Sequence, residues 1–381
     1  MCGISGVYAR QISDQQRGII QAVMESQFAR GPDHQAMISL AGENSQVVLA
    51  HNRLSIIDLS EQANQPMWDA KGRYCITYNG EIYNYLELRQ ELKSLGFEFH
   101  TQSDTEVILN AFSCWGIEAL ERFRGPFAFA LFDKQSDTLW LCRDRFAVRP
   151  LYYLSINQSL YFASSTAVLA KALNLKPNLA YVAKGLKYLV YEDGSELAPY
   201  ETILSLPAGS YLQAKLNSEG RLSETIKVYY DLTSRVESLI EELPVDRIDL
   251  LLERISVTLE EAVKLRLRTD VPLAISLSSG LDSSTVAAMV SKAHHDTIGF
   301  SFGHPQHKKT EGPLVAKCAR FLDMKIEYVW PTAAEMIEGL DQTLTAQDAP
   351  FASLSIVAQY LLYKRVRACG VKVLLGGAGW R

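Results

Sequence analysis

The segment LAISLSSGLDSSTVAAMVSK, residues 273–292, decides the fold of the second half of the chain. Its first five residues, 273–277, form a short apolar run of the length expected for a buried strand. A loop of small polar residues follows at 278–284, and residues 285–292 have the composition of a helix. A buried strand that leads through a loop into a helix predicts one unit of a parallel α/β sheet.

The same rhythm continues beyond this segment. We expect further strands at 298–302, 326–330 and 371–375, with helices at 314–322 and 356–366. Strands that alternate with helices predict a parallel, doubly wound sheet. Ligands of such sheets bind at the carboxyl ends of the strands, which is where the loop 278–284 is expected to lie.

The loop 278–284, Ser-Ser-Gly-Leu-Asp-Ser-Ser, is suited to binding an anion. Small residues let backbone N–H groups surround an anion, and the helix that follows adds a partial positive charge. Asp282 could hold a Mg²⁺ ion that bridges phosphates. The alternative is an ordinary capped turn, because serine and aspartate are good helix N-caps.

A polar, charge-rich stretch at 216–246 separates this region from the first part of the chain. We therefore expect a first domain at 2–215, a linker at 216–246 and a second domain at 247–381. The second domain begins with apolar residues at helical spacing from Ile248 to Ala262, which predicts a long amphipathic helix.

The first domain has the pattern of packed sheets. Short apolar runs bounded by turn residues or charges occur at 47–50, 73–78, 127–132, 139–142, 151–154 and 160–163. Apolar residues at helical spacing occur at 19–28, 88–95 and 107–112. Many strands combined with a few helices predict a layered sandwich.

Cys2 is the candidate nucleophile of the first domain. Removal of Met1 would leave a thiol and a free α-amine on the same residue. An α-amine has a pKa of roughly 8, so it is partly neutral at pH 7 and can act as a base toward the thiol. The resulting thiolate can attack a carbonyl carbon. The alternatives are a disordered terminus and a small buried hydrophobic residue.

Several separated motifs accompany Cys2. They are RGPD at 30–33, RLSII at 53–57, NGEIYN at 79–84, Ser103-Asp104, GPFAFALFD at 125–133 and RDR at 143–145. Their order and spacing resemble the glutaminase domain of class II glutamine amidotransferases, over about the first 210 residues. This resemblance implies an αββα sandwich of the N-terminal-nucleophile hydrolase type.

Glutamine offers three groups for recognition, and the motifs contain a partner for each. Arg53 carries a fork of donors for the α-carboxylate, while Asp104 and Glu81 can accept from the α-ammonium. The Asn79 amide and the Gly80 N–H suit the oxyanion of the acyl intermediate. The resemblance implies the same roles, and it adds Leu54, Ser55, Ile56 and Ile57 to the glutamine contacts.

Each of these residues also has an ordinary structural interpretation. Asn79-Gly80 alone is more often a hairpin turn, Asp104 a helix cap and Arg53 a solvated surface charge. Taken together, in one order and at plausible spacing, they favour function.

The loop 278–284 resembles the PP-motif of ATP pyrophosphatases, a group that includes the synthetase domain of asparagine synthetases. These enzymes adenylate a carboxylate and release pyrophosphate. The motif has glycine where this chain has Ser279, although serine still donates its N–H. The resemblance implies a metal contact at Asp282 and ATP contacts at Leu277, Ser278, Ser279, Gly280, Asp282, Ser283, Ser284, Phe302, Gly376 and Gly377.

The chain departs from this family at several positions. The family continues past residue 381 and carries an acidic loop where this chain reads GGAGWR, with Ala378 in place of an acidic or amide residue. Further departures are the missing glutamate in Asp348-Ala349-Pro350, Lys325 in place of histidine, and Ala147 and Arg149 in place of glycine and lysine. We expect an intact glutaminase half and an incomplete, impaired synthetase half.

Composition excludes several other classes. With 38 basic and 43 acidic residues, the net charge of −5 argues against nucleic acid as a partner. No apolar run approaches the roughly 18 residues that span a bilayer, and the N-terminus does not resemble a signal peptide, so we expect a cytoplasmic protein without membrane contact. The six cysteines have no CxxC spacing, so we expect free thiols.

The leading hypothesis is a glutamine-dependent amidotransferase of the asparagine synthetase type. Ammonia released from glutamine at Cys2 would amidate a carboxylate activated by ATP and Mg²⁺, with aspartate as the expected acceptor. A homodimer is left open. The alternatives are a different acid acceptor, a glutaminase without synthetase activity, and an inactive chain that acts as a binding module.

Overall fold

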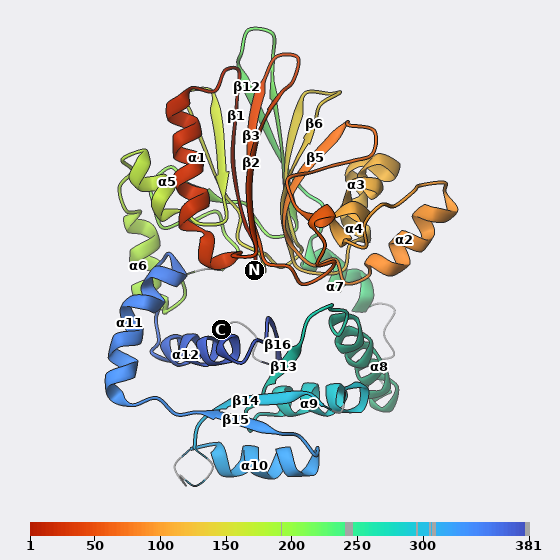
Figure 1. Cartoon of the computed structure of the whole chain (residues 1–381), viewed down its shortest axis with the longest axis vertical. Helices are drawn as coiled ribbons and strands as arrows, with labels where there is room; N and C mark the ends of the chain where they lie inside the picture. Colours follow the sequence, from red (N-terminus) through yellow and green to blue (C-terminus); the bar gives the residue numbers. More distant parts are fainter. Residues whose placement is uncertain (192, 241–246, 295, 305, 307–309, 378–381) are drawn as a thin grey trace. The chain divides into compact units, whose positions relative to one another are not determined.

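The computed structural model describes residues 1–191, 193–240, 247–294, 296–304, 306 and 310–377. The chain separates into a first unit, Met1–Lys187 with Tyr191–Glu237, and a second unit, Tyr188–Val190 with Ser238–Arg381 (Figure 1). Ala378 and residues 241–246 of the expected linker lie outside the described residues.

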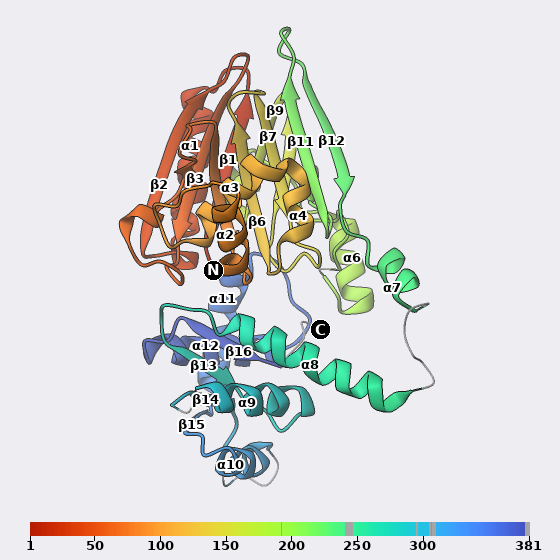
Figure 2. The same ribbon diagram turned by 90° about the vertical axis from the view of Figure 1, so that its right-hand side faces the viewer.

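Two antiparallel sheets form the centre of the first unit (Figure 2). One sheet has the order β10 (Leu204–Ser205), β8 (Tyr152–Ile156), β9 (Ser159–Ala163), β1 (Gly3–Ala9), β3 (Gln46–Arg53) and β2 (His34–Ala41). The other has the order β12 (Leu222–Val228), β11 (Ser210–Leu216), β7 (Thr138–Arg143), β6 (Phe127–Asp133), β5 (Tyr74–Gly80) and β4 (Met67–Trp68).

Helices cover both outer faces of this pair of sheets (Figure 1). On one face α1 (Asp14–Ser26) and α5 (Ala167–Ala172) pack on β1 and β3, and on the other α2 (Tyr85–Ser94), α3 (Asp104–Trp115) and α4 (Ala119–Arg122) pack on β5 and β6. A third apolar cluster fills the space between the sheets. The predicted αββα sandwich is therefore confirmed.

Strand alternation decides which side chains enter the space between the sheets. In β1, Ile4 and Tyr8 lie in this inner layer, whereas Val7 lies under α1. Residues two apart along a strand face the same way. The same alternation places Arg53 of β3 and Asn79 of β5 on the inner side, together with Cys2 just before β1. The residues that separate motifs predicted to act on glutamine therefore share one end of the sandwich.

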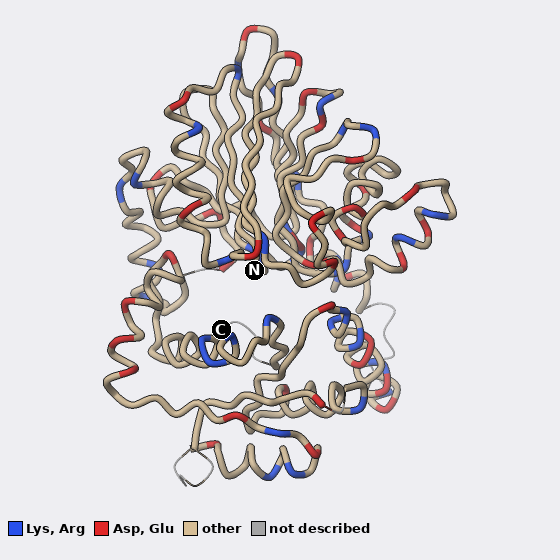
Figure 3. Tube along the Cα trace, viewed as in Figure 1, with Lys and Arg blue, Asp and Glu red and all other residues tan. Residues whose placement is uncertain are grey.

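The second unit contains a parallel sheet with the order β15 (Ile326–Val329), β14 (Ile298–Phe302), β13 (Leu273–Ser276) and β16 (Val373–Gly376). One face packs on α8 (Ile248–Arg266), α9 (Leu281–Ala293) and α10 (Gly312–Phe321), and the other on α12 (Ser355–Ala368). Helices on both faces of a parallel sheet confirm the predicted doubly wound domain. Acidic and basic side chains are interspersed along α8 (Figure 3).

All of the strands expected from short apolar runs form in the structure, and six others among the described residues were not expected. Of these, β12 lies inside the expected linker 216–246 and pairs with β11 along its whole length. That linker prediction is therefore corrected, because β12 belongs to the first sandwich. Its residues are nearly all exposed, so no apolar alternation marks it.

Several helices also differ from expectation, among them α9 and α11 of the second unit. Helix α9 begins at Leu281 rather than at residue 285, which places Asp282 in its first turn. Helix α11 (Ala333–Gln347) was not predicted, although Thr332 and Glu335 form a capping box at its start. That box is readable from the sequence, and it would have marked the helix.

Candidate functional site

Cys2 is held at the end of the sandwich by contacts from two segments. The Leu54 N–H, just after β3, donates to the Cys2 sulfur at 3.4 Å. The Arg30 Nε, in the short helix Phe28–Arg30, donates to the Cys2 carbonyl at 3.1 Å. Cys2 remains partly exposed. All six cysteines are free thiols, as predicted.

The amino terminus lies in surroundings that favour a neutral amine. Burial lowers the pKa of the Met1 α-amine from 8.0 to about 5. The charges of Arg149 and Arg30 also lower it, while Cys2 and Glu81 act in the opposite direction. Arg149 and Glu81 form an ion pair at 3.7 Å, with both side chains largely buried. At pH 7 such an amine is therefore neutral, and its lone pair is available to a neighbouring thiol.

Arg53 is buried and keeps part of its guanidinium available. Its Nη1 donates to the Ser60 carbonyl and to the Asn64 side chain, both at 2.8 Å, and its Nη2 donates to the Asp58 carbonyl. Among the described residues, no acceptor is bonded to Nε–H or to the second N–H of Nη2. Unbonded guanidinium donors of this kind can bind a carboxylate. A solvated surface charge is therefore excluded for Arg53, which is only 5% exposed.

The residues after Arg53 form an irregular segment beside Cys2. The Ser55 N–H donates to the Asp33 carboxylate at 2.8 Å, and the Asp33 N–H donates to the Arg53 carbonyl. Ile57 is buried and Ile56 is half-buried. The RGPD and RLSII motifs are therefore joined directly by hydrogen bonds.

Asn79 and Gly80 lie within β5 and pair with Ala128 and Phe127 of β6, so they are not a hairpin turn. Both polar atoms of the Asn79 side chain are buried and have no hydrogen-bond partner among the described residues. A Cβ at Gly80 would lie 2.4 Å from the Pro126 carbonyl oxygen, so only glycine permits this approach of β5 to β6.

Asp104 occupies the first turn of α3, but Ser103 is the residue that caps the helix. The Asp104 carboxylate accepts from the Tyr78 hydroxyl at 2.8 Å and from the Ile82 N–H at 2.9 Å. Burial raises the pKa of this carboxyl, and the hydrogen bonds from Ile82 and Tyr78 oppose the rise. Tyr78 thus links Asp104 to the strand that carries Asn79.

His51 belongs to the same end of the sandwich, although no sequence pattern singled it out. Its Nε2 lies 3.0 Å from the Tyr78 carbonyl and ties β3 to β5 beside Asn79. Burial lowers the pKa of His51 to about 3, so the ring is neutral and Nε2 donates. Its position two residues before Arg53 was the only signal in the sequence.

The second constellation lies at the carboxyl edge of the parallel sheet. The loop 278–284 follows β13, and Gly377 follows β16, where the strand order reverses. A Cβ at Gly377 would lie 2.4 Å from the Ser283 nitrogen, so this backbone packs closely on the first turn of α9. Ligands of doubly wound sheets bind at such a reversal.

The N–H groups of this loop are bonded to oxygens of the protein. Ser278 N–H donates to the Ser283 hydroxyl and Gly280 N–H to the Ser278 hydroxyl, both at 3.2 Å. Ser279 N–H donates to the Glu311 carboxylate at 2.9 Å. Glu311 lies 32 positions further along the chain than Ser279, and no sequence pattern pointed to it.

The other residues predicted to contact ATP are spread along this edge. Leu277 is only 2% exposed and packs in the core, which leaves its backbone at the strand end. Phe302 ends β14 and is exposed, with its ring 6.2 Å from that of Trp330. Gly376 pairs with Ser276, and Ser284 donates to the Gly280 carbonyl.

A metal site is not preformed here. Among the described residues, no group of three or more His, Cys, Asp or Glu side chains is placed to hold a metal ion. Asp282 is exposed in the first turn of α9, so it could contribute one carboxylate to a Mg²⁺ ion that arrives with phosphates.

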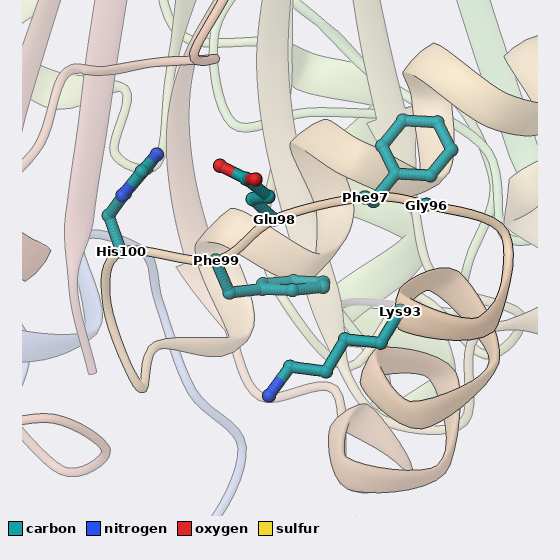
Figure 4. A pocket seen from close by; sticks show the side chains of 6 residues that line it. All are labelled: Lys93, Gly96, Phe97, Glu98, Phe99 and His100. Atoms are coloured by element: carbon teal, nitrogen blue, oxygen red, sulfur yellow. The ribbon is translucent and has the colours of Figure 1, made fainter.

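A surface hollow of about 530 Å³ lies elsewhere in the first unit (Figure 4). It is lined by Lys93, Gly96, Phe97, Glu98, Phe99 and His100. None of these residues belongs to either constellation.

Within the described part of the chain, no helix is both long and apolar enough to cross a membrane.

Comparison with known proteins agrees with this division. Residues 1–230 match a family model described as a glutamine amidotransferase domain, so the first unit belongs to that class. Residues 254–379 match the asparagine synthase model. The chain belongs to the family of glutamine-hydrolysing asparagine synthetases.

Three curated relatives place it more closely. The chain is similar to asparagine synthetase [glutamine-hydrolyzing] 1 of Bacillus subtilis, with 31% identity over 100% of this chain and 58% of the relative. It is 30% identical to a putative asparagine synthetase 2 of Methanocaldococcus jannaschii, over 100% of this chain and 74% of that protein. It is 29% identical to the amidase chry2 of Gibberella zeae, over 92% of this chain and 52% of that protein. The chain therefore spans between about half and three quarters of the length of these relatives.

Proposed function

We propose that this chain is a glutamine-dependent amidotransferase of the asparagine synthetase type. Cys2 hydrolyses glutamine to glutamate and ammonia, and the ammonia amidates a carboxylate that has been activated with ATP. The observation that carries the proposal is the shared position of Cys2, Arg53 and Asn79 at one end of the sandwich. Leu54 is bonded to the Cys2 sulfur, and His51 ties the strand of Arg53 to the strand of Asn79.

In the first half-reaction, the unbonded donors of Arg53 bind the α-carboxylate of glutamine, and Asp104 and Glu81 accept from its α-ammonium. The neutral α-amine of processed Cys2 takes the thiol proton, and the thiolate attacks the side-chain carbonyl. Asn79 Nδ2 and Gly80 N–H donate to the oxyanion. The α-amine returns the proton to the leaving nitrogen, the C–N bond breaks and ammonia leaves, after which water hydrolyses the thioester to glutamate and restores the thiol.

The buried Asn79 amide supports the oxyanion role in particular. A buried donor without a partner destabilises a protein by about 1–3 kcal/mol, so such groups are uncommon unless they act on a ligand. Asn79 lies in a regular strand, and its side chain satisfies no backbone group among the described residues.

In the second half-reaction, the loop 278–284 and Gly377 hold the phosphates of ATP, with Asp282 on the accompanying Mg²⁺. The acceptor carboxylate attacks the α-phosphorus and pyrophosphate leaves. Ammonia then displaces AMP and forms the amide. Aspartate is the acceptor that the names of the Bacillus and Methanocaldococcus relatives support. The relative named an amidase keeps a different acid open as the acceptor.

The proposal is tested by measuring glutamate release from glutamine by the purified, Met1-processed chain. We expect activity that is lost in Cys2→Ala and retained in Cys114→Ala, a matched change at a partly buried thiol of α3. ATP and aspartate are then added, and AMP and asparagine are followed.

The outcomes separate the candidate functions. Glutamate with AMP and asparagine supports the whole proposal, and glutamate alone leaves a glutaminase. A folded, processed chain that releases no glutamate would refute the proposal and leave the binding module as the remaining interpretation.

A further inference from the structure

The Glu311 carboxylate makes an unusual contact with the phosphate loop. Glu311 is the N-cap residue of α10, yet its side chain makes no capping bond to that helix. It instead accepts from the Ser279 N–H, at 2.9 Å, on the loop after β13. A carboxylate at this place presents two oxygens and a negative charge, as a phosphate group does.

The neighbouring backbone N–H groups of the loop are also hydrogen-bonded within the protein. The N–H groups of Ser278 and Gly280 are bonded to hydroxyl oxygens of the loop itself. Three successive backbone donors are therefore occupied by internal oxygens. The two hydroxyl contacts are neutral and easily exchanged, whereas the Glu311 contact carries a charge. An incoming phosphate must displace Glu311 and then remain close to its charge.

We propose that Glu311 is an internal competitor for the phosphate loop and makes it select polyphosphates that carry a divalent cation. The proposal rests on the ATP site of the proposed function. A metal-free polyphosphate meets repulsion from Glu311. A polyphosphate bound to Mg²⁺ brings a cation that prefers carboxylate oxygens, so the displaced Glu311 side chain becomes an attractive group. The carboxylate of Asp282, in the first turn of α9, likewise repels a metal-free polyphosphate and attracts one that carries Mg²⁺.

The test uses the full chain and inorganic pyrophosphate as the probe, with binding followed by calorimetry in the presence of Mg²⁺ and in its absence. For Glu311→Gln we expect metal-free pyrophosphate to bind about tenfold more tightly than to the unchanged protein. We also expect Mg²⁺ to strengthen binding less in Glu311→Gln than in the unchanged chain.

Two further variants control the interpretation. Glu338→Gln removes the same charge from an exposed position of α11 and should leave both affinities unchanged. Glu311→Asp keeps the charge but shortens the side chain, so it should lose the bond to Ser279 and still keep part of the Mg²⁺ effect. Thermal melting of each variant checks that the second unit remains folded.

The possible failures are distinct. If no variant binds pyrophosphate with or without Mg²⁺, the proposed ATP site is wrong and this inference fails with it. If the unchanged chain binds Mg²⁺-pyrophosphate but Glu311→Gln binds metal-free pyrophosphate no more tightly, the site stands and the role of Glu311 as a competitor is overturned.

Discussion

Asn79 provides the sharpest test, because replacing it should damage activity and stabilise the fold. The change is Asn79→Leu, which keeps the branched shape of the side chain and leaves no cavity. Both amide atoms of Asn79 are buried and without a partner among the described residues, and each such atom destabilises by about 1–3 kcal/mol. We allow for an imperfect fit of leucine and expect the free energy of unfolding to rise by about 1–2 kcal/mol. For a unit of this size, the melting temperature should rise by about 2–8 °C.

The same change should remove the side-chain donor to the oxyanion. Loss of one such donor lowers kcat by roughly 10²–10³, with little effect on the KM for glutamine. The assays are glutamate release under saturating glutamine and unfolding in urea. Asn52→Leu is the matched control, since Asn52 is equally buried but donates to the Met24 carbonyl at 3.0 Å. That control should be destabilised by about 1 kcal/mol.

Two results would refute the reasoning. If Asn79→Leu is destabilised as much as Asn52→Leu, the Asn79 amide is held by hydrogen bonds in the folded protein. If kcat is unchanged, Asn79 does not donate to the oxyanion, whatever the effect on stability.

The other predictions concern His51, Ala147 and Arg53. The pKa of His51 falls from 6.5 to about 3 on folding, so between these pH values the unfolded chain binds one more proton than the folded chain. The free energy of unfolding should therefore fall as pH is lowered from 6.5, by up to about 1.4 kcal/mol per pH unit. Urea titrations of His51→Gln should lack this pH-dependent component. Ala147 has φ of 54°, a conformation that glycine adopts freely, so Ala147→Gly should raise the free energy of unfolding by about 1 kcal/mol. As a control, Ala183→Gly at an exposed position of helix α6 (Leu179–Tyr188) should lower the free energy of unfolding by about 1 kcal/mol. Arg53→Lys replaces a bidentate fork by a point charge, so steady-state kinetics should show the KM for glutamine raised by about tenfold or more; an unchanged KM would contradict the assigned role of Arg53.

The local chemistry of the chain was readable from its sequence. The apolar runs at 127–132 and 298–302 predicted β6 and β14, because a buried strand needs a continuous apolar segment. The alternation of strand and helix predicted the doubly wound second unit. The motifs around Cys2 and the loop 278–284 named the candidate residues, since these residue types have few other uses in that order.

The sequence could not reveal elements that are held by pairing rather than by pattern. The edge strand β12 is nearly all exposed, so its residues look like a linker, and its hydrogen bonds to β11 are what make it a strand. The place of Ala147 in the left-handed region is likewise invisible, because alanine gives no sign of positive φ.

What the sequence determined, then, was the identity of the reactive groups: a thiol at Cys2, a guanidinium at Arg53, an amide at Asn79 and a loop of small residues. Tertiary structure decided the burial, hydrogen bonding and orientation of these groups. Burial between two sheets makes His51 neutral and leaves the Asn79 amide without a partner in the part of the chain that the structure describes. Strand alternation places Arg53 and Asn79 on the same inner side. Packing also brings Glu311 to Ser279 across 32 positions of sequence. Desolvation and long-range contacts depend on what surrounds a group in space, which a linear pattern does not contain.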